Sequence, residues 1–445
     1  MTNESIDLEY QEFEKALIEE LGGSRKLVVV QAPPGSGKTH TLIAVVAALV
    51  KNGKSVALAA QTNRQADDIA IRWSKEYGNL PATRLGSSSS VPPNNFPSNV
   101  IWETKARELP RTPGIYISTS AKWTTLREPD PFDLLAVDEA WQMSWADLMQ
   151  CANLSAKYYL IGDPGQIPPV VTIDVRRWET APRPPHKPAP EVVMSDPDLV
   201  NIAFVGSLPA CRRLPYESVE FIKPFYAFDF EAYAKLGERV ITFKKEVSNE
   251  SLNELTDKLK TGAPMIATLT TPNDGPSLEV DTELANSIKE IVLTLLNRET
   301  SFIKDDKGKK QKLKIEDIGV SATHRAMNGE IRRVLGADLN QVSIDTPERW
   351  QGLQRPFMIV VHPLSSSIDP SDFDLETGRL CVMTSRHQSG LIVITRDHVG
   401  KTLAALIPEA AQAPGKPDIV GRGHAAHSKF WEELEKANRV LPITF

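Results

Sequence analysis

Short runs of apolar residues alternate along the chain with longer segments in which apolar positions recur every three or four residues. The run at 27–30 precedes such a segment at 41–49, and the run at 55–60 precedes another at 65–77. Runs of this length are typical of buried strands, and the longer segments are typical of helices that cover a sheet. The pattern therefore predicts an α/β protein built on parallel sheets.

The same alternation continues to the end of the chain, and several runs finish in polar residues. In parallel sheets, polar residues at the carboxyl ends of strands gather at one edge, where ligands bind. The further predicted strands lie at 114–120, 132–137, 158–162, 265–269, 318–322, 342–344, 357–361 and 391–394. These strands predict two doubly wound domains in tandem, with a cleft between them.

Changes in composition suggest the domain boundaries. We expect a first domain at 1–204, a second at 205–400, and a tail at 401–445 that carries a short amphipathic helix. A serine- and proline-rich stretch at 78–114 reads as a small, loop-rich insertion in the first domain. A second proline-rich stretch, 172–204, reads as a loop.

The strand at 27–30 leads into Gln31–Thr39, which reads Gln-Ala-Pro-Pro-Gly-Ser-Gly-Lys-Thr. Such a loop curls its backbone N–H groups around phosphate oxygens at a helix N-terminus, where the dipole also favours anions. Lys38 would reach the β- and γ-phosphates, and the Thr39 hydroxyl would ligate Mg²⁺. Ala32 stands where the general pattern has a glycine. The flanking strand and helix nevertheless favour a nucleoside triphosphate site over a chance turn.

The predicted strand at 132–137 ends in the carboxylates Asp138 and Glu139. Asp138 would hold Mg²⁺ through water, and Glu139 would orient and deprotonate the attacking water. By itself this pair also fits a solvated acidic turn. Together with Lys38 and Thr39 upstream, it predicts nucleotide hydrolysis.

The net charge, the cysteine content and the length of the apolar runs limit the classes of protein to which this chain could belong. The formal net charge is −6, so the overall electrostatic field of the protein does not attract nucleic acid. Any nucleic-acid binding must come from a local groove. The three cysteines, Cys151, Cys211 and Cys381, lie far apart, which indicates a reducing compartment and argues against a disulfide framework or a zinc module. No apolar run approaches the roughly 18 residues of a membrane span. We expect a cytoplasmic protein without membrane contact.

Several motifs stand in the order found in superfamily 1 helicases, and the chain resembles a compact member of their 5′-to-3′ branch, which includes the Upf-like and senataxin-like helicases. Gln31–Thr39 is similar to that family's Q-G-P-P-G-T-G-K-T, and 138–142 fits the D-E-A-x-Q form of motif II. Residues 162–169 fit G-D-x-x-Q-L-x-P of motif III. Looser matches are 60–67 to motif Ia, 212–215 to motif IV, 318–327 to the I-G-V-I-x-P-Y stretch, 345–354 to motif V and 379–386 to motif VI.

The resemblance implies two RecA-like domains, ATP and Mg²⁺ as cofactors, and single-stranded DNA or RNA as the track of a monomeric motor with a possible protein partner. It implies that Arg212 and Arg386 are arginine fingers that stabilise negative charge on the γ-phosphate. It also implies that Gln166 senses loss of that phosphate. An arginine near a cleft could otherwise form an ordinary surface salt bridge.

The resemblance also implies sets of binding residues. The predicted ATP contacts are Gln11, Pro34, Gly35, Ser36, Gly37, Lys38, Thr39 and His40, and the predicted strand contacts are Thr62, Asn63, Ser120, Thr323, His324 and Trp350. Gln11 would read the adenine edge, or it is an exposed helix residue. Trp123, Trp141 and Trp350 would stack on bases, but tryptophans more often pack in a core.

These features together predict an ATP-driven helicase or translocase. A small-molecule kinase would need neither paired arginines nor the glutamine of motif III in a second α/β unit. The alternative is a nucleic-acid-stimulated or partner-dependent ATPase that remodels complexes without processive unwinding. It stays open because strand-separating wedges often lie in insertions, and the insertion at 78–114 is short. Backbone and stacking contacts serve DNA and RNA alike, so the sequence does not choose between them.

Overall fold

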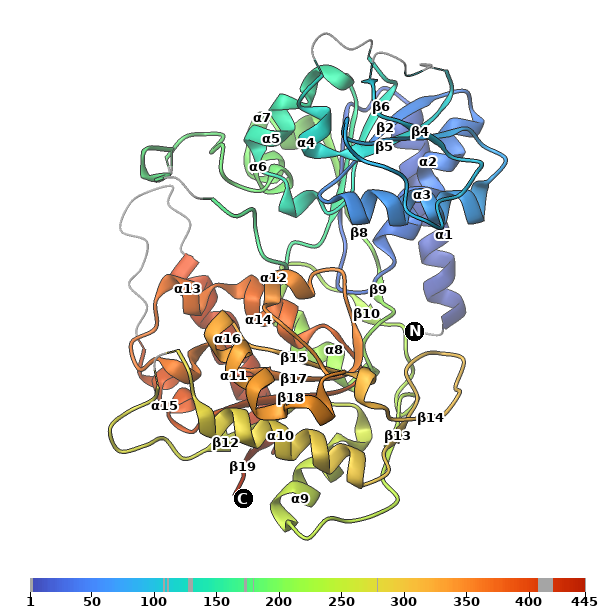
Figure 1. Cartoon of the computed structure of the whole chain (residues 1–445). Coiled ribbons are helices and arrows are strands. Elements are labelled where there is room, and N and C mark those ends of the chain that lie inside the picture. Colours follow the sequence, from blue (N-terminus) through green and yellow to red (C-terminus); the bar gives the residue numbers. More distant parts are fainter. Residues whose placement is uncertain are drawn as a thin grey trace. The chain divides into compact units, whose positions relative to one another are not determined.

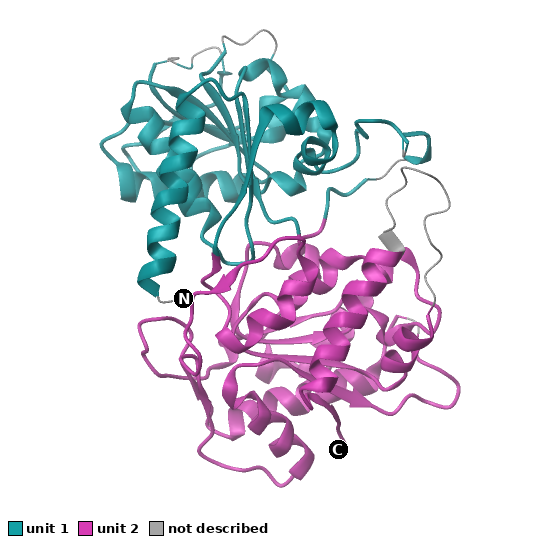
Figure 2. Cartoon of the chain, turned by 180° about the vertical axis from the view of Figure 1, so that it is seen from behind, with its two compact units in different colours: residues 1–164, 168–209 teal, residues 165–167, 210–445 magenta. Residues whose placement is uncertain are grey.

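The computed structural model describes residues 3–106, 109, 112–126, 131–171, 174–178, 180–277, 279–406 and 419–444. The chain divides into two compact units, Met1–Pro164 with Pro168–Pro209 and Gly165–Ile167 with Ala210–Phe445 (Figure 2). Each unit is built around one large parallel sheet flanked by helices (Figure 1). The predicted α/β class with two parallel-sheet domains is therefore confirmed.

The sheet of the first unit has eight parallel strands in the order β4-β3-β5-β2-β6-β7-β1-β8. Its central strands are fully buried, as their unbroken apolar runs require. The strands are β1 (Leu27–Gln31), β2 (Ser55–Ala60), β3 (Ala82–Leu85), β4 (Ile101–Glu103), β5 (Gly114–Thr119), β6 (Leu134–Val137), β7 (Tyr158–Gly162) and β8 (Ala203–Ser207). Because β8 pairs with β1, the first unit includes residues that the sequence pattern places beyond its boundary at 204.

The loop-rich stretch at 78–114 also contributes to this sheet. Its strands β3 and β4 extend the sheet beyond β5, and the residues between them form the expected loops. Strand β3 escapes pattern analysis because it contains the buried Arg84, whose Nε donates to Asp67 Oδ1 at 2.8 Å and whose Nη2 donates to Asn63 Oδ1 at 3.0 Å. Residues 107–108 and 110–111 lie outside the described part.

The helices of the first unit cover this sheet. They are α1 (Asn3–Gly22), α2 (Lys38–Lys51), α3 (Asn63–Tyr77), α4 (Ser120–Trp123), α5 (Trp145–Gln150), α6 (Ala189–Ser195) and α7 (Pro197–Ile202). Helices α6 and α7 lie within the proline-rich stretch 172–204, which the sequence pattern assigns wholly to a loop. Each has proline in its first turn, where the missing N–H costs no hydrogen bond, so these prolines start helices rather than exclude them.

The second unit contains a six-stranded parallel sheet in the order β16-β15-β17-β18-β12-β19. Its strands are β12 (Met265–Leu269), β15 (Ile318–Ser321), β16 (Ser343–Asp345), β17 (Arg355–Val361), β18 (His387–Arg396) and β19 (Val440–Pro442). Short accessory strands are β9 (Ala210–Cys211), β10 (Glu231–Ala232), β11 (Ile241–Thr242), β13 (Ser301–Phe302) and β14 (Gln311–Lys312).

Helices of the second unit pack on this sheet and complete its core. They are α8 (Tyr216–Ile222), α9 (Glu250–Lys258), α10 (Thr282–Asn297), α11 (Arg325–Leu335), α12 (Pro347–Trp350), α13 (Asp372–Leu375), α14 (Thr377–Thr384), α15 (His398–Ala405) and α16 (Ile419–Lys436). The C-terminal segment belongs to this unit, because α16 buries Phe430 and Leu434 in its core and β19 pairs with β12. Residues 407–418 of the predicted tail lie outside the described part.

Two further observations concern the described residues only. None of their helices has the length and apolar character needed to cross a bilayer. Nor do three or more of their His, Cys, Asp or Glu side chains gather into a group that could hold a metal ion.

Candidate nucleotide site

The glycine-rich loop connects the carboxyl end of β1 to the first turn of α2. Gly35 and Gly37 have φ angles of 67° and 85°, a left-handed conformation that glycine adopts without the steric cost of a Cβ. Gly37 is the N-cap residue of α2, and its carbonyl accepts from the N–H groups of His40 and Thr41. The loop thus leads into a helix N-terminus beginning at Lys38, the setting that phosphate binding requires.

The two halves of the predicted hydrolysis site meet in the first unit. Lys38 Nζ lies 2.7 Å from Glu139 Oε1, and Thr39 Oγ1 donates to Asp138 Oδ2 at 3.0 Å. The meeting follows from the strand order β6-β7-β1, because parallel strands bring their carboxyl ends to one edge of the sheet. Residues about a hundred positions apart in the sequence therefore form one polar cluster.

Burial strongly affects the acid–base character of Asp138. Its side chain is almost fully buried, and this burial, with the neighbouring Glu139 charge, raises its pKa to about 6, against the opposing effects of Lys38 and Thr39. A hydroxyl and a carboxylate this close together are oxygen donors of the type Mg²⁺ prefers. Thr39 and Asp138 are therefore the residues that would hold Mg²⁺, whose charge would neutralise the buried carboxylate.

Glu139 occupies a sharp backbone turn at the end of β6. Its φ of 53° and ψ of 43° lie in the left-handed region, which costs a non-glycine residue about 1–2 kcal/mol. Its N–H donates to Asp138 Oδ1 at 2.9 Å, and its carbonyl accepts from Gln142 N at 2.8 Å. These bonds hold a strained turn that points the carboxylate toward Lys38, and such strain commonly accompanies a functional site.

Helix α1 also reaches the phosphate loop, through the side chain of Tyr10, the neighbour of Gln11, which the resemblance assigns to the adenine edge. Tyr10 is buried and its hydroxyl donates to the carbonyl of Ser36 at 2.8 Å, whereas Gln11 is exposed to solvent. The helical spacing of the buried residues Ile6, Tyr10 and Leu17 was a signal that could have singled out Tyr10. Within the described residues, the buried Ser36 hydroxyl has no hydrogen-bond partner.

The predicted strand contacts of the first unit lie at the same sheet edge. Thr62 caps α3, its Oγ1 accepting from Gln65 N at 3.2 Å, and Asn63 holds the buried Arg84. Ser120 Oγ donates to Gln61 Oε1 at 3.3 Å. Each of these side chains therefore has a local structural role as well as a position suited to a ligand.

In the second unit, the two predicted arginine fingers lie in different surroundings. Arg386 is 1% exposed; its Nε donates to Val382 O at 3.1 Å, and its Nη2 has no hydrogen-bond partner among the described residues. The guanidinium carbon of Arg212 lies 4.1 Å from the ring centre of Tyr233, a cation–π contact. Gln166, the predicted γ-phosphate sensor, is buried and belongs to the short segment that groups with this unit.

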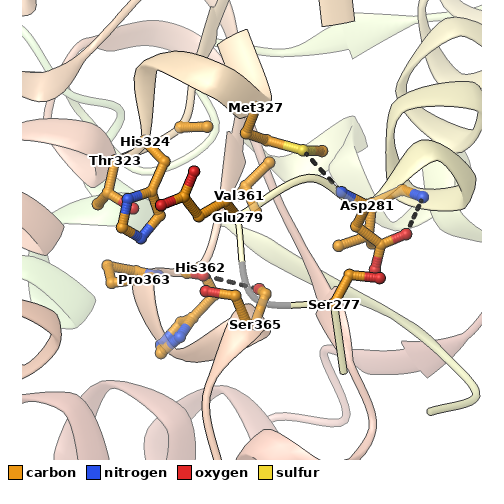
Figure 3. A pocket seen from close by; sticks show the side chains of 13 residues that line it. Ser277, Glu279, Asp281, Thr323, His324, Met327, Val361, His362, Pro363 and Ser365 are labelled. Carbon is orange, nitrogen blue, oxygen red and sulfur yellow. Dashed lines mark hydrogen bonds between the residues drawn. The ribbon is translucent and has the colours of Figure 1, made fainter. Parts of the chain in front are cut away.

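Thr323 and His324 follow β15 and line a small pocket together with Met327 and the turn at 362–366 (Figure 3). The His324 ring centre lies 5.7 Å from that of Phe373. The pocket has a volume of about 20 Å³, room for about one water molecule. This space cannot admit a nucleobase, so contacts at Thr323 and His324 would be to a strand passing over the surface.

Trp350 does not support the predicted base-stacking role. Its side chain is 1% exposed, and its Nε1 donates to the carbonyl of Val320 at 3.1 Å, inside the core of the second unit. Trp123 is likewise buried and donates to Leu58 O at 2.9 Å, and Trp141 is buried too. The packing interpretation applies to all three, because a ring with no exposed face cannot stack on a base.

Comparisons with known proteins agree with the motifs. A family model described as an AAA domain matches residues 9–177. The DNA replication ATP-dependent helicase/nuclease DNA2 of Saccharomyces cerevisiae is 26% identical over 173 residues, which cover 37% of this chain and 11% of that protein. Its Mus musculus counterpart is 31% identical over 159 residues, which cover 33% of this chain and 15% of that protein.

An uncharacterized ATP-dependent helicase of Methanocaldococcus jannaschii is 34% identical over 89 residues, 20% of this chain and 13% of that protein. Among solved structures, the Arterivirus nonstructural protein 10 helicase aligns with a TM-score of 0.44 and 15% identity, covering 85% of this chain and 62% of that one. The matched stretches span only 11–15% of the length of these curated relatives. The matches to curated helicases confirm the resemblance to superfamily 1 helicases that the motifs indicate.

Proposed function

We propose that this chain, which resembles superfamily 1 helicases, is an ATP-dependent motor that moves along single-stranded nucleic acid. The observation that carries this proposal is the convergence of Lys38 and Thr39 with Asp138 and Glu139 in one partly buried cluster. This set contains a phosphate-binding cation, two oxygen donors suited to Mg²⁺, and a carboxylate that can act as a base toward water.

In the proposed reaction, the phosphate loop and Lys38 bind the β- and γ-phosphates of ATP. Bound Mg²⁺ would neutralise phosphate charge, held by Thr39 and Asp138. Glu139 orients a water molecule and accepts its proton as the water attacks the γ-phosphorus. For this step Glu139 must exchange its contact with Lys38 for one with water, because a carboxylate engaged by an ammonium group is a weaker base.

We further propose that Arg212 and Arg386 stabilise charge on the γ-phosphate and that Gln166 senses its loss. The buried Nη2 of Arg386 supports its part, because burying a guanidinium donor without a partner is costly unless a ligand satisfies it. Thr62, Asn63, Ser120, Thr323 and His324 would contact the strand. Movement from 5′ to 3′ and action as a monomer rest on the resemblance alone.

The test is ATP hydrolysis by the purified protein without nucleic acid, with single-stranded DNA and with single-stranded RNA, at one fixed low salt concentration. Strong stimulation by one strand would support the motor and identify its track. Hydrolysis that neither strand stimulates would favour the partner-dependent ATPase instead. A duplex-unwinding assay then separates a helicase from an enzyme that remodels complexes without processive unwinding.

A further inference from the structure

A chain of hydrogen bonds crosses three neighbouring strands of the first unit. Strands β5, β2 and β6 are parallel and adjacent, and their carboxyl ends lie in register. The residues that follow them are Ser120, Gln61 and Asp138. Ser120 Oγ donates to Gln61 Oε1 at 3.3 Å, and Gln61 Nε2 donates to the backbone carbonyl of Asp138 at 3.4 Å. The side chain of Gln61 therefore links a predicted strand contact to the predicted hydrolysis site.

The peptide bond between Asp138 and Glu139 is held from both sides. Its N–H donates to Asp138 Oδ1 at 2.9 Å, and its C=O accepts from Gln61. Glu139 has a left-handed backbone, a conformation that persists only where neighbours hold it. Because this peptide plane sets the direction of the Glu139 side chain, a change in the Gln61 contact changes the position of the carboxylate relative to Lys38.

We propose that Gln61 is a positioning residue that couples a nucleic-acid phosphate bound at Ser120 to the orientation of Glu139. This inference rests on the proposed function. A serine hydroxyl has one hydrogen to donate, and a phosphate oxygen can only accept. A phosphate that takes this hydrogen therefore removes it from Gln61 Oε1, which frees the amide to turn and loosens its contact with Asp138 O.

The geometry suits an exchangeable contact. The bond from Gln61 to Asp138 O exceeds the roughly 2.7–3.2 Å usual for N–H···O bonds, and the bond from Ser120 exceeds the roughly 2.5–3.0 Å usual for O–H···O bonds, so both are readily given up to a charged partner. The series of hydrogen bonds also requires a central group that accepts on one side and donates on the other. An amide does both, whereas a carboxylate only accepts. If Gln61 served only to tie strand ends together, its loss would lower stability without changing the response to a strand.

The experiment compares the wild type with Gln61→Ala and with the similarly shaped Gln61→Glu. The measured quantities are kcat with and without saturating single-stranded oligonucleotide, and the Kd of a fluorescent oligonucleotide by anisotropy. We expect the ratio of stimulated to basal kcat to fall about tenfold in both variants, the scale of a typical coupling energy, while Kd stays within about threefold. Gln61→Glu is informative because it keeps the size of the side chain but loses the donor to Asp138 O.

Ser55→Ala is the matched control, because Ser55 lies at the opposite end of β2, where its hydroxyl donates to Asp133 Oδ2 at 3.0 Å. It should keep the wild-type ratio. Retention of that ratio by Gln61→Ala or Gln61→Glu would overturn the inference, and so would an equal loss in Ser55→Ala. Circular dichroism and thermal unfolding of each variant identify any that fail to fold.

A double-mutant cycle tests whether Ser120 and Gln61 act through the same series of hydrogen bonds. Ser120→Ala should lower the stimulation ratio, and Ser120→Ala combined with Gln61→Ala should be no worse than Gln61→Ala alone. If the double variant lost the product of the two single losses in stimulation ratio, the two residues would act independently and the coupling would be refuted. A wild-type protein that no strand stimulates would overturn the proposed motor together with this inference. Stimulation that survives Gln61→Ala overturns the inference alone.

Discussion

Lys38 and Glu139 form an ion pair in which Nζ and Oε1 lie 2.7 Å apart and the two side chains are 17% and 9% exposed. The contact joins the phosphate loop to the end of β6, so the proposed phosphate ligand and the proposed base hold each other in place. Such a pair, shielded from solvent on most sides, is expensive to break by removing one partner, because the other charge is left buried.

Replacing the proposed base should stop turnover without stopping binding. We expect Glu139→Gln to lower kcat for ATP by at least about a hundredfold, the scale of a lost general base, while nucleotide still binds. Hydrolysis is measured by phosphate release, and binding by fluorescence of a labelled ATP analogue. Glu191→Gln, which loses an ion pair with Lys187 elsewhere in the unit, is the control and should hydrolyse ATP normally. Wild-type turnover in Glu139→Gln would contradict the assignment.

Lys38→Ala should act on both binding and turnover, because the ammonium group contacts phosphates in the ground state as well as in the transition state. It should leave Glu139 buried beside no cation, so a modest loss of thermal stability is also expected. Calorimetric titration with ATP and a thermal melt separate the two effects. Unchanged affinity and turnover in Lys38→Ala would rule out the phosphate-binding role.

Removal of divalent cations should abolish hydrolysis if Thr39 and Asp138 hold Mg²⁺. We expect EDTA to stop turnover and added Mg²⁺ to restore it, with Asp138→Asn requiring a much higher Mg²⁺ concentration than the wild type, because it loses the anionic oxygen donor. The measurement is a Mg²⁺ titration of initial rates. The Asp133→Asn variant, which changes a carboxylate that bonds Ser55 and Lys54 at the opposite end of β2, should titrate like the wild type.

Arg386→Ala should lower kcat far more than it weakens nucleotide binding, because an arginine finger acts mainly on charge that develops in the transition state. Its steady-state kcat and its ATP affinity are compared with those of Arg333→Ala, which removes an exposed arginine paired with Glu330. If kcat and affinity fell by the same factor in Arg386→Ala, the finger role would be wrong.

Trp350→Ala should destabilise the second unit rather than weaken strand binding directly. Deleting a fully buried tryptophan is expected to cost about 3–5 kcal/mol of the free energy of unfolding, while Trp350→Phe should cost less because most of the ring volume is retained. Chemical denaturation gives the stability, and anisotropy with a labelled oligonucleotide gives the affinity. A Trp350→Phe variant of normal stability that lost strand affinity would restore the base-stacking role.

The sequence alone determined the strand–loop–helix at 27–49, the carboxylate pair after 132–137 and the α/β class, because these depend on local apolar runs and on residue types with one established chemistry. Tertiary structure decided which side chains meet. Tyr10 contacts the phosphate loop, Trp350 packs inside a core, and β3 and β4 extend a sheet from a stretch predicted to be loop.

The hydrogen bonds that Gln61 makes to Ser120 and Asp138 could not be predicted from the sequence either. Its two partners, Ser120 and Asp138, lie 59 and 77 positions away in the sequence, and only the strand order β5-β2-β6 brings them beside Gln61. Local sequence patterns indicate whether a residue favours helix, strand or loop, but the order of the strands is set by the packing of the whole sheet. A side chain that needs one partner on each side is therefore recognised only when the sheet is formed.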